Sequence, residues 1–164
     1  MDRSQISDTS DKSLPTLDRI DRKLLRALQG NAALSLADLA ELVSLSRSAC
    51  GRRLQRLEQE GVIGRRVTLL EPAAVGLPLT VFISVRTSQH NAAWAAQFSE
   101  ITRRISGILE VYRIGGTVDY LIKAVVKDMP DYDRLYQELI AADLLEVSAG
   151  FVMEEICSTT ELPV

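Results

Sequence analysis

The 164-residue sequence predicts an α+β protein with two domains. The first is a three-helix helix-turn-helix domain, plain or winged, and the second is a ferredoxin-like βαββαβ domain. Three observations support this prediction. Apolar residues recur at helical spacing in three short segments over about 17–60, and apolar and polar residues alternate in several segments of the second half. The two parts also differ in charge, with a net charge of +3 over residues 1–66 and −6 over residues 67–164.

Three helices are predicted in the first domain. Leucine and isoleucine residues at helical spacing mark the first helix, and Gly30 with Asn31 ends it. The second helix opens at Ser35, whose hydroxyl can accept a backbone N–H, while Asp38 is placed to reach back in a capping box. Ser46 is a second N-cap candidate, so a tight turn is expected between the second and third helices.

The third helix carries arginines opposite a buried stripe. Cys50, Leu54 and Leu57 recur at i, i+4 and i+7, and Gly61 follows where a helix C-terminus favours a left-handed residue. The outward side and the N-terminal end supply the candidates for contacting DNA in the major groove: Ser46, Arg47, Ser48, Arg52, Arg53, Gln55 and Arg56. The alternative is that these arginines only solvate a surface helix.

The candidate DNA-binding residues have different expected roles. Arg52 and Arg56 could donate paired hydrogen bonds to guanine, each worth about 1–3 kcal/mol of discrimination. The N-terminal members of the set suit phosphate or base-edge contacts, aided by the helix dipole. Arg53 lies nearer the buried stripe, where an ion pair with Glu58 or Glu60 competes with a DNA contact.

Strands and helices are predicted in the order β-α-β-β-α-β along the second half. Residues 79–86 alternate apolar and polar, as expected of a half-buried strand. Gly115 and Gly116 mark a turn, and Pro130 suits the first turn of a helix. The other predicted elements are helices with apolar residues over 94–105 and 132–140 and strands over 108–114, 119–127 and 146–157. This order is typical of a ferredoxin-like sandwich.

The face of the predicted sheet that the two helices do not cover is expected to contact another protein chain. Phe82 points to the side that the two helices do not cover, so we expect pairs of subunits to stack sheet on sheet. A dimer would place two recognition helices about 34 Å apart, on successive major grooves of an inverted repeat. A short apolar strand is also predicted at 67–70, in the linker before Glu71 and Pro72.

Composition and motifs argue against other classes of protein. Residues 1–15 lack the apolar region of a signal peptide, and the longest apolar stretch is too short to span a bilayer. Cys50 and Cys157 have neither a disulfide pattern nor metal-ligand spacing. The single histidine, His90, has no catalytic motif beside it. We therefore expect a cytoplasmic protein that is not an enzyme, with no catalytic residue, metal, cofactor or membrane contact.

Four segments together resemble the Lrp/AsnC (feast/famine) family of transcriptional regulators. These are LDRIDRKLLRALQ at 17–29, SLADLAELVSLSRSAC at 35–50, RRLQRLEQEGVI at 52–63 and GTVDYLIK at 116–123. The runs LTVFISVRTSQH and FVMEEICSTTELP look closest to a subgroup that includes a cysteine-responsive regulator.

The resemblance implies an organisation and a set of partners. After a tail over 1–16 that its polar composition predicts to be disordered, the chain divides into a helix-turn-helix domain over 17–66, a linker strand over 67–78 and an effector-binding and oligomerisation domain over 79–164. Double-stranded DNA with an inverted-repeat operator, a small amino acid and further copies of the chain are the implied partners, with homodimers assembling to an octamer.

The family's effector turn falls on five consecutive residues of this chain. They are Gly116, Thr117, Val118, Asp119 and Tyr120. Backbone N–H groups of the glycines could bind a carboxylate, and Asp119 could bind an ammonium group. Without the resemblance, the sequence favours a tight turn in which the Asp119 side chain caps its own backbone. Thr117 stands where an acidic residue is common in the family, and Gly51 where a larger residue is usual.

Other functions remain as alternatives at the level of sequence. The principal one is an amino-acid-sensing regulatory subunit of a metabolic enzyme that does not bind DNA, and the arginine-bearing helix pair counts against it. An RNA-binding sheet would share the strand order, but the strands lack the aromatic and glycine signature of that class.

Overall fold

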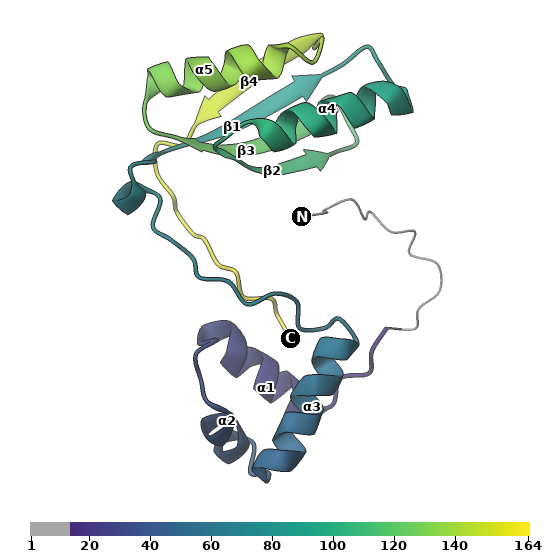
Figure 1. The fold of residues 1–164 in the computed structure, drawn as a ribbon, viewed down its shortest axis with the longest axis vertical. Coiled ribbons are helices and arrows are strands. Elements are labelled where there is room, and N and C mark those ends of the chain that lie inside the picture. The colour runs from purple at the N-terminus through teal and green to yellow at the C-terminus, as the bar shows by residue number, and fades with distance from the viewer. Residues whose placement is uncertain (1–13) are drawn as a thin grey trace. The chain divides into compact units, whose positions relative to one another are not determined.

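The computed structural model describes residues 14–164 and divides into two compact units (Figure 1). One unit holds the described residues up to Val67 together with Ser158–Val164, and the other holds Thr68–Cys157. The predicted tail over 1–16 lies outside the described residues except for its last three, which have no regular structure.

Three helices form the first unit, as predicted. They are α1 (Arg19–Gly30), α2 (Leu36–Leu42) and α3 (Arg47–Gln59). Their facing sides enclose one apolar core of Leu24, Leu39, Ala40, Val43, Cys50 and Leu54. Within the described residues this unit contains no strand, so the helix-turn-helix domain is of the plain type, without a β-wing.

Local capping explains where these helices begin and end. The Ser35 hydroxyl accepts the Asp38 N–H while the Asp38 carboxylate accepts the Ser35 N–H, which confirms the predicted capping box. Ser46 caps α3 by accepting the N–H of Ala49 at 3.2 Å. Gly61 follows α3 with φ 75°, in the left-handed region that favours glycine.

The last residues of the chain lie against α1. The side-chain amide of Gln29 donates to the carbonyl of Leu162 at 3.0 Å and accepts the Leu162 N–H at 2.6 Å. Arg26 donates to the carbonyl of Val164 at 2.6 Å. The end of the expected domain over 79–164 therefore packs with the first unit.

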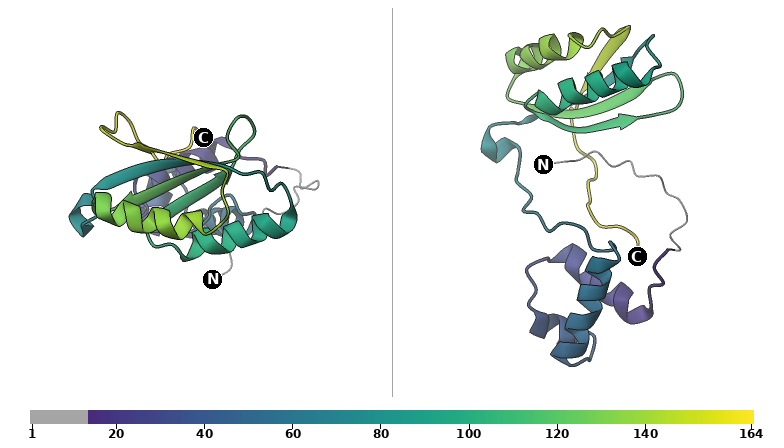
Figure 2. Two further views of the ribbon diagram at one scale, coloured as in Figure 1. Left: turned by 90° about the horizontal axis from the view of Figure 1, so that it is seen from above. Right: turned by 45° about the vertical axis from the view of Figure 1, so that its right-hand side comes forward.

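The second unit is the predicted βαββαβ sandwich. Its elements are β1 (Leu79–Arg86), α4 (Ala92–Arg104), β2 (Ile108–Arg113), β3 (Tyr120–Val126), α5 (Met129–Ile140) and β4 (Glu146–Phe151). The strands form one antiparallel sheet in the order β2-β3-β1-β4. Helices α4 and α5 lie side by side on one face of the sheet (Figure 2).

Alternating residues of the central strands supply the core of this unit. Val81, Ile83 and Val85 of β1 are fully buried beneath the two helices, as is Ile122 of β3. On the helix side, aromatic rings close the core: Trp94 stacks on Phe98 with ring centroids 5.0 Å apart, and the indole N–H donates to the Ala142 carbonyl at 2.8 Å.

Two predicted strands are shorter than expected or absent. Residues 67–70 form no strand, and Val67, Leu69 and Leu70 are all more than 60% exposed, although their composition suits a strand. A strand needs a neighbour that bonds its N–H and C=O groups, and no backbone hydrogen bond joins this segment to another described residue. For the same reason β4 ends at Phe151, where its pairing with β1 ends, and not at Cys157.

Two further properties of the described chain bear on function. Among the helices of residues 14–164, none combines the length and apolar character needed to cross a bilayer. The same residues bring together no group of three or more His, Cys, Asp or Glu side chains that could hold a metal ion.

Candidate nucleic-acid interface and effector site

The recognition helix α3 is fixed in the first unit by its buried stripe. Cys50, Leu54 and Leu57 are all buried, as their spacing predicted. The opposite side and the N-terminal end are exposed to solvent and carry five of the seven predicted DNA-binding residues: Ser46, Arg47, Ser48, Arg52 and Gln55.

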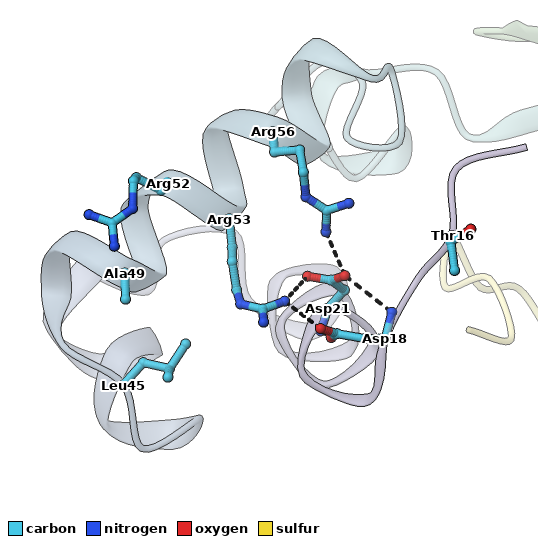
Figure 3. Close-up of a pocket in the computed structure, with 8 residues that line it drawn as sticks. All are labelled: Thr16, Asp18, Asp21, Leu45, Ala49, Arg52, Arg53 and Arg56. Atoms are coloured by element: carbon cyan, nitrogen blue, oxygen red, sulfur yellow. Dashed lines mark hydrogen bonds and ion pairs between the residues drawn. The ribbon is translucent and has the colours of Figure 1, made fainter.

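Arg53 and Arg56, the other two predicted residues, are only half exposed and turn toward the start of α1 (Figure 3). The Arg53 Nη1 atom lies 2.6 Å from Asp18 Oδ2 and 2.9 Å from Asp21 Oδ1. The Arg56 Nη2 atom lies 2.6 Å from Asp21 Oδ2, and its Nη1 atom lies 3.3 Å from Glu60. These two guanidinium groups join α3 to α1.

Asp21 stands at the centre of this ion-pair cluster. Its side chain is 1% exposed, yet each carboxylate oxygen has a guanidinium partner, and Oδ2 also accepts the N–H of Asp18. Asp18 in turn caps α1 by accepting the N–H groups of Ile20 and Asp21 at 2.8 Å. The capping box of α1 thus doubles as the acidic half of an interhelical ion pair.

The expected partner of Arg53 was wrong. Arg53 pairs with Asp18 and Asp21, whereas Glu60 pairs with Arg56 and Glu58 with Arg66. A residue five positions along a helix lies on a different face, so Glu58 is badly placed for Arg53. The signal for the true partners was present in the sequence as two aspartates three residues apart before a helical apolar pattern.

The ion pairs shift the pKa values of the cluster. The pKa of Asp18 lies below its ordinary value because the Asp21 N–H and the Arg53 guanidinium both donate to its carboxylate. The pKa of Arg53 is raised by hydrogen bonds to Asp18 and Asp21, and that of Arg56 by its hydrogen bond to Asp21. All three shifts favour the charged, paired forms.

Arg52 differs from its neighbours. It is exposed, and no hydrogen bond or ion pair with another described residue holds it. In Figure 3 its guanidinium points away from the aspartates, along the outer side of α3. Together with Arg53, Arg56 and Asp21 it lines an open depression of about 570 Å³ beside the helix.

The predicted effector turn connects β2 and β3 in the second unit. Gly116 has φ 128°, a conformation that glycine adopts readily. Asp119 accepts the Thr87 N–H at 2.9 Å through its side chain and donates its own N–H to the Val85 carbonyl at 3.0 Å. Asp119 therefore binds the end of β1 and does not cap its own turn.

A cavity of about 190 Å³ lies beside Asp119. The structure brings two predicted effector residues, Asp119 and Tyr120, to its wall, but not the three residues before them. The other lining residues come from β2, from the loop between β1 and α4, and from the first turn of α4: Arg113, Thr87, Gln89, His90, Asn91, Ala92 and Ala95. An acidic and a basic side chain on one small cavity match the two charges of a free amino acid.

Sequence reasoning missed Arg113 and the segment before α4. Arg113 pairs with Tyr120 across β2 and β3, and Val85 of β1 pairs with Tyr120 from the other side. Strand pairing therefore assembles the cavity wall from segments that are far apart along the chain. The only local signal was the polar run from Thr87 to Asn91 between a strand and a helix.

The fold and these two sites define the class of the protein as a helix-turn-helix regulator with a ligand-binding domain. Residues 17–63 match the family model described as winged helix-turn-helix DNA-binding, and residues 80–162 match that of the Lrp/AsnC ligand binding domain. The chain belongs to the Lrp/AsnC family of transcriptional regulators.

Individual relatives agree with this assignment. The chain is 43% identical over 148 residues to the glutamate uptake regulatory protein of Zymomonas mobilis, covering 90% of each chain. It is 41% identical over 150 residues to the DNA-binding transcriptional activator DecR of Escherichia coli, covering 90% of this chain and 99% of DecR.

Solved structures show the same similarity. An AsnC family regulator from Agrobacterium tumefaciens superposes with a TM-score of 0.85 at 47% identity. A transcriptional regulator from Neisseria meningitidis in complex with L-methionine superposes with a TM-score of 0.84 at 33% identity. Each match covers 90% of this chain and 97% of the other.

The lowered pKa of Asp18 leads to a pH prediction. A carboxyl whose pKa is lowered by folding stabilises the protein above its unfolded pKa, about 3.9, and this contribution is lost as the pH falls through the folded value. Asp18→Asn keeps an N-cap oxygen but has no charge for Arg53. In urea unfolding followed by circular dichroism, we expect the variant to be less stable at pH 7 and the difference from wild type to close below about pH 4. A difference that is the same at pH 7 and pH 3 would contradict this assignment.

Proposed function

We propose that the protein regulates transcription by placing α3 in the major groove, with Arg52 as its principal base-reading residue. The supporting observation is the exposed Arg52 guanidinium, which no described side chain engages, on the side of α3 opposite the core. Its planar fork can donate two parallel hydrogen bonds to the O6 and N7 atoms of guanine.

The remaining exposed residues of α3 suit supporting contacts. Ser46, Arg47 and Ser48 stand at the N-terminal end of the helix, where free N–H groups and the helix dipole attract phosphate. Gln55 lies one turn along from Arg52 and can reach a neighbouring base or phosphate. Arg53 and Arg56 are assigned a positioning role because their guanidinium groups already bind carboxylates.

The first test replaces Arg52. We expect Arg52→Ala to relax base preference at one position of the site, at a cost of about 1–3 kcal/mol for the preferred sequence. Binding constants for duplexes with single base changes measure this effect. Arg103→Ala is the matched control because it removes the same charge from an exposed position in the second unit. Equal weakening on every sequence would show that Arg52 contacts only phosphate.

We further propose that the cavity beside Asp119 binds a free amino acid that modulates DNA binding. Asp119 supplies a carboxylate for the ammonium group, and Arg113 supplies a cation for the carboxylate of the ligand. The L-methionine complex of the Neisseria relative supports an amino-acid ligand for this class of domain. The resemblance to a cysteine-responsive subgroup makes cysteine one of the amino acids to be tried.

Calorimetric titration with the twenty amino acids tests the effector proposal. Asp119→Asn should weaken binding of the ligand found by about 10- to 100-fold, because an amide replaces a charged acceptor. The asparagine oxygen can still accept the Thr87 N–H, which preserves the turn. Asp133→Asn on the exposed side of α5 serves as the control. Absence of heat with all twenty amino acids would remove the proposal.

We also propose a homodimer that assembles further, to an octamer, and the sheet face without helices supports the dimer. Phe82 of β1 is 40% exposed and Tyr112 of β2 is 51% exposed, and both lie on this face with Leu121 of β3. Large apolar side chains on one open sheet face favour stacking against a second copy. Such a dimer would present two α3 helices to an inverted repeat.

Light scattering of the purified chain tests the assembly. We expect Phe82→Glu to lower the mass of the particle, because stacking would bury a charge in an apolar interface, whereas in the separated chain Lys123 lies opposite to pair with it. Ile140→Glu is the control, since Ile140 is similarly exposed, at 38%, on α5. An unchanged mass for Phe82→Glu would exclude this face from the interface.

DNA binding also bears on where the protein acts and on whether it is a regulator or an enzyme. A partner of double-stranded DNA implies a site of action in the cytoplasm, and we infer that the protein is a regulator and not an enzyme. The relatives named as transcriptional regulators support this inference. A regulatory subunit of a metabolic enzyme would give no salt-sensitive retention of duplex DNA, so a gel shift separates the two readings.

A further inference from the structure

We propose that Asp21 is a specificity-determining residue, because it holds Arg53 and Arg56 away from DNA and leaves Arg52 to read the bases. This inference rests on the proposed placement of α3 in the major groove. Asp21 belongs to the first turn of α1 and not to the recognition helix α3.

The geometry restrains both arginines through one carboxylate. Arg53 binds one oxygen of Asp21 at 2.9 Å and Arg56 binds the other at 2.6 Å. With both guanidinium groups in place the Asp21 side chain is only 1% exposed, so these charge-assisted bonds are shielded from solvent. A buried carboxylate that loses its partner is strongly unfavourable, so swinging either arginine out to a phosphate carries a penalty.

The cluster also cancels charge where the duplex would lie. Four arginines belong to α3, but Asp18 and Asp21 neutralise two of them. Arg47 and Arg52 therefore remain as the free cations of this helix within the described chain. Since each phosphate-neutralising cation adds sequence-independent affinity, pairing two of the four limits binding to the wrong DNA.

The experiment compares salt dependence for three variants of the full chain. Fluorescence anisotropy would follow binding to two probes: a random-sequence 30-base-pair duplex, and a duplex selected in vitro by the wild-type protein. Asp21→Asn releases Arg56 from its buried partner, Arg56→Gln removes that cation, and Asp38→Asn raises the charge of the same unit by one without an arginine partner.

We expect Asp21→Asn to tighten binding to the random duplex and to steepen the slope of log K against log salt by about 0.9, the value for one added phosphate contact. The ratio of selected to random affinity should fall. Asp38→Asn and Arg56→Gln should leave the slope unchanged. Simple loss of structure would flatten the slope, so a steeper slope separates sequestration of the arginines from a purely structural role.

Two results would overturn the inference. One is a slope that flattens by about 0.9 in Arg56→Gln, since Arg56 would then contact phosphate in the wild-type protein. The other is a folded Asp21→Asn protein whose slope equals that of Asp38→Asn. If Asp21→Asn does not fold, the slope of Arg56→Gln alone tests the inference. This variant is expected to fold because the Arg56 side chain lies at the surface and is 39% exposed.

Different results would contradict the proposed function. A wild-type protein that binds neither duplex would overturn the DNA-reading proposal and this inference together. Wild-type binding that depends on Arg52, combined with a flattened slope in Arg56→Gln, would overturn only the role of Asp21.

Discussion

A carboxylate almost closed to solvent holds the recognition helix of this protein against its neighbour. Asp21 belongs to the first turn of α1, and its two oxygens meet guanidinium groups that lie one turn apart on α3. These charged contacts add to the apolar packing of α3, and Arg52 points away from them (Figure 3).

Sequence periodicity predicted most of the secondary structure because most elements are amphipathic. The Cys50, Leu54 and Leu57 stripe identified the buried side of α3, and alternation along 79–86 identified β1 with its bounds. The prediction of a strand at 67–70 was wrong because a suitable side-chain pattern is not sufficient to form a strand. Its backbone groups also require a neighbour, and no short-range pattern shows whether one is present.

The two sites were harder to predict because they depend on pairs of residues distant in sequence. Asp21 and Arg56 are 35 positions apart, and only the packing of α1 against α3 brings them together. Arg113 likewise reaches the cavity of Asp119 only through the pairing of β2 with β3. Periodicity says which side of each element is buried, but it does not say which charged residues of two elements will meet.

The hydrogen bonds between Gln29 and Leu162 close the chain into a large ring, since the polypeptide leaves the helix-turn-helix unit at residue 67 and rejoins it at 158. The ring is held by weak bonds and not by a covalent link, so it can open and close at modest free-energy cost. While it is closed, both ends of the 68–157 segment are anchored in the unit that carries Asp21. The second unit is therefore connected to the helix-turn-helix unit at two points of the chain and not at one.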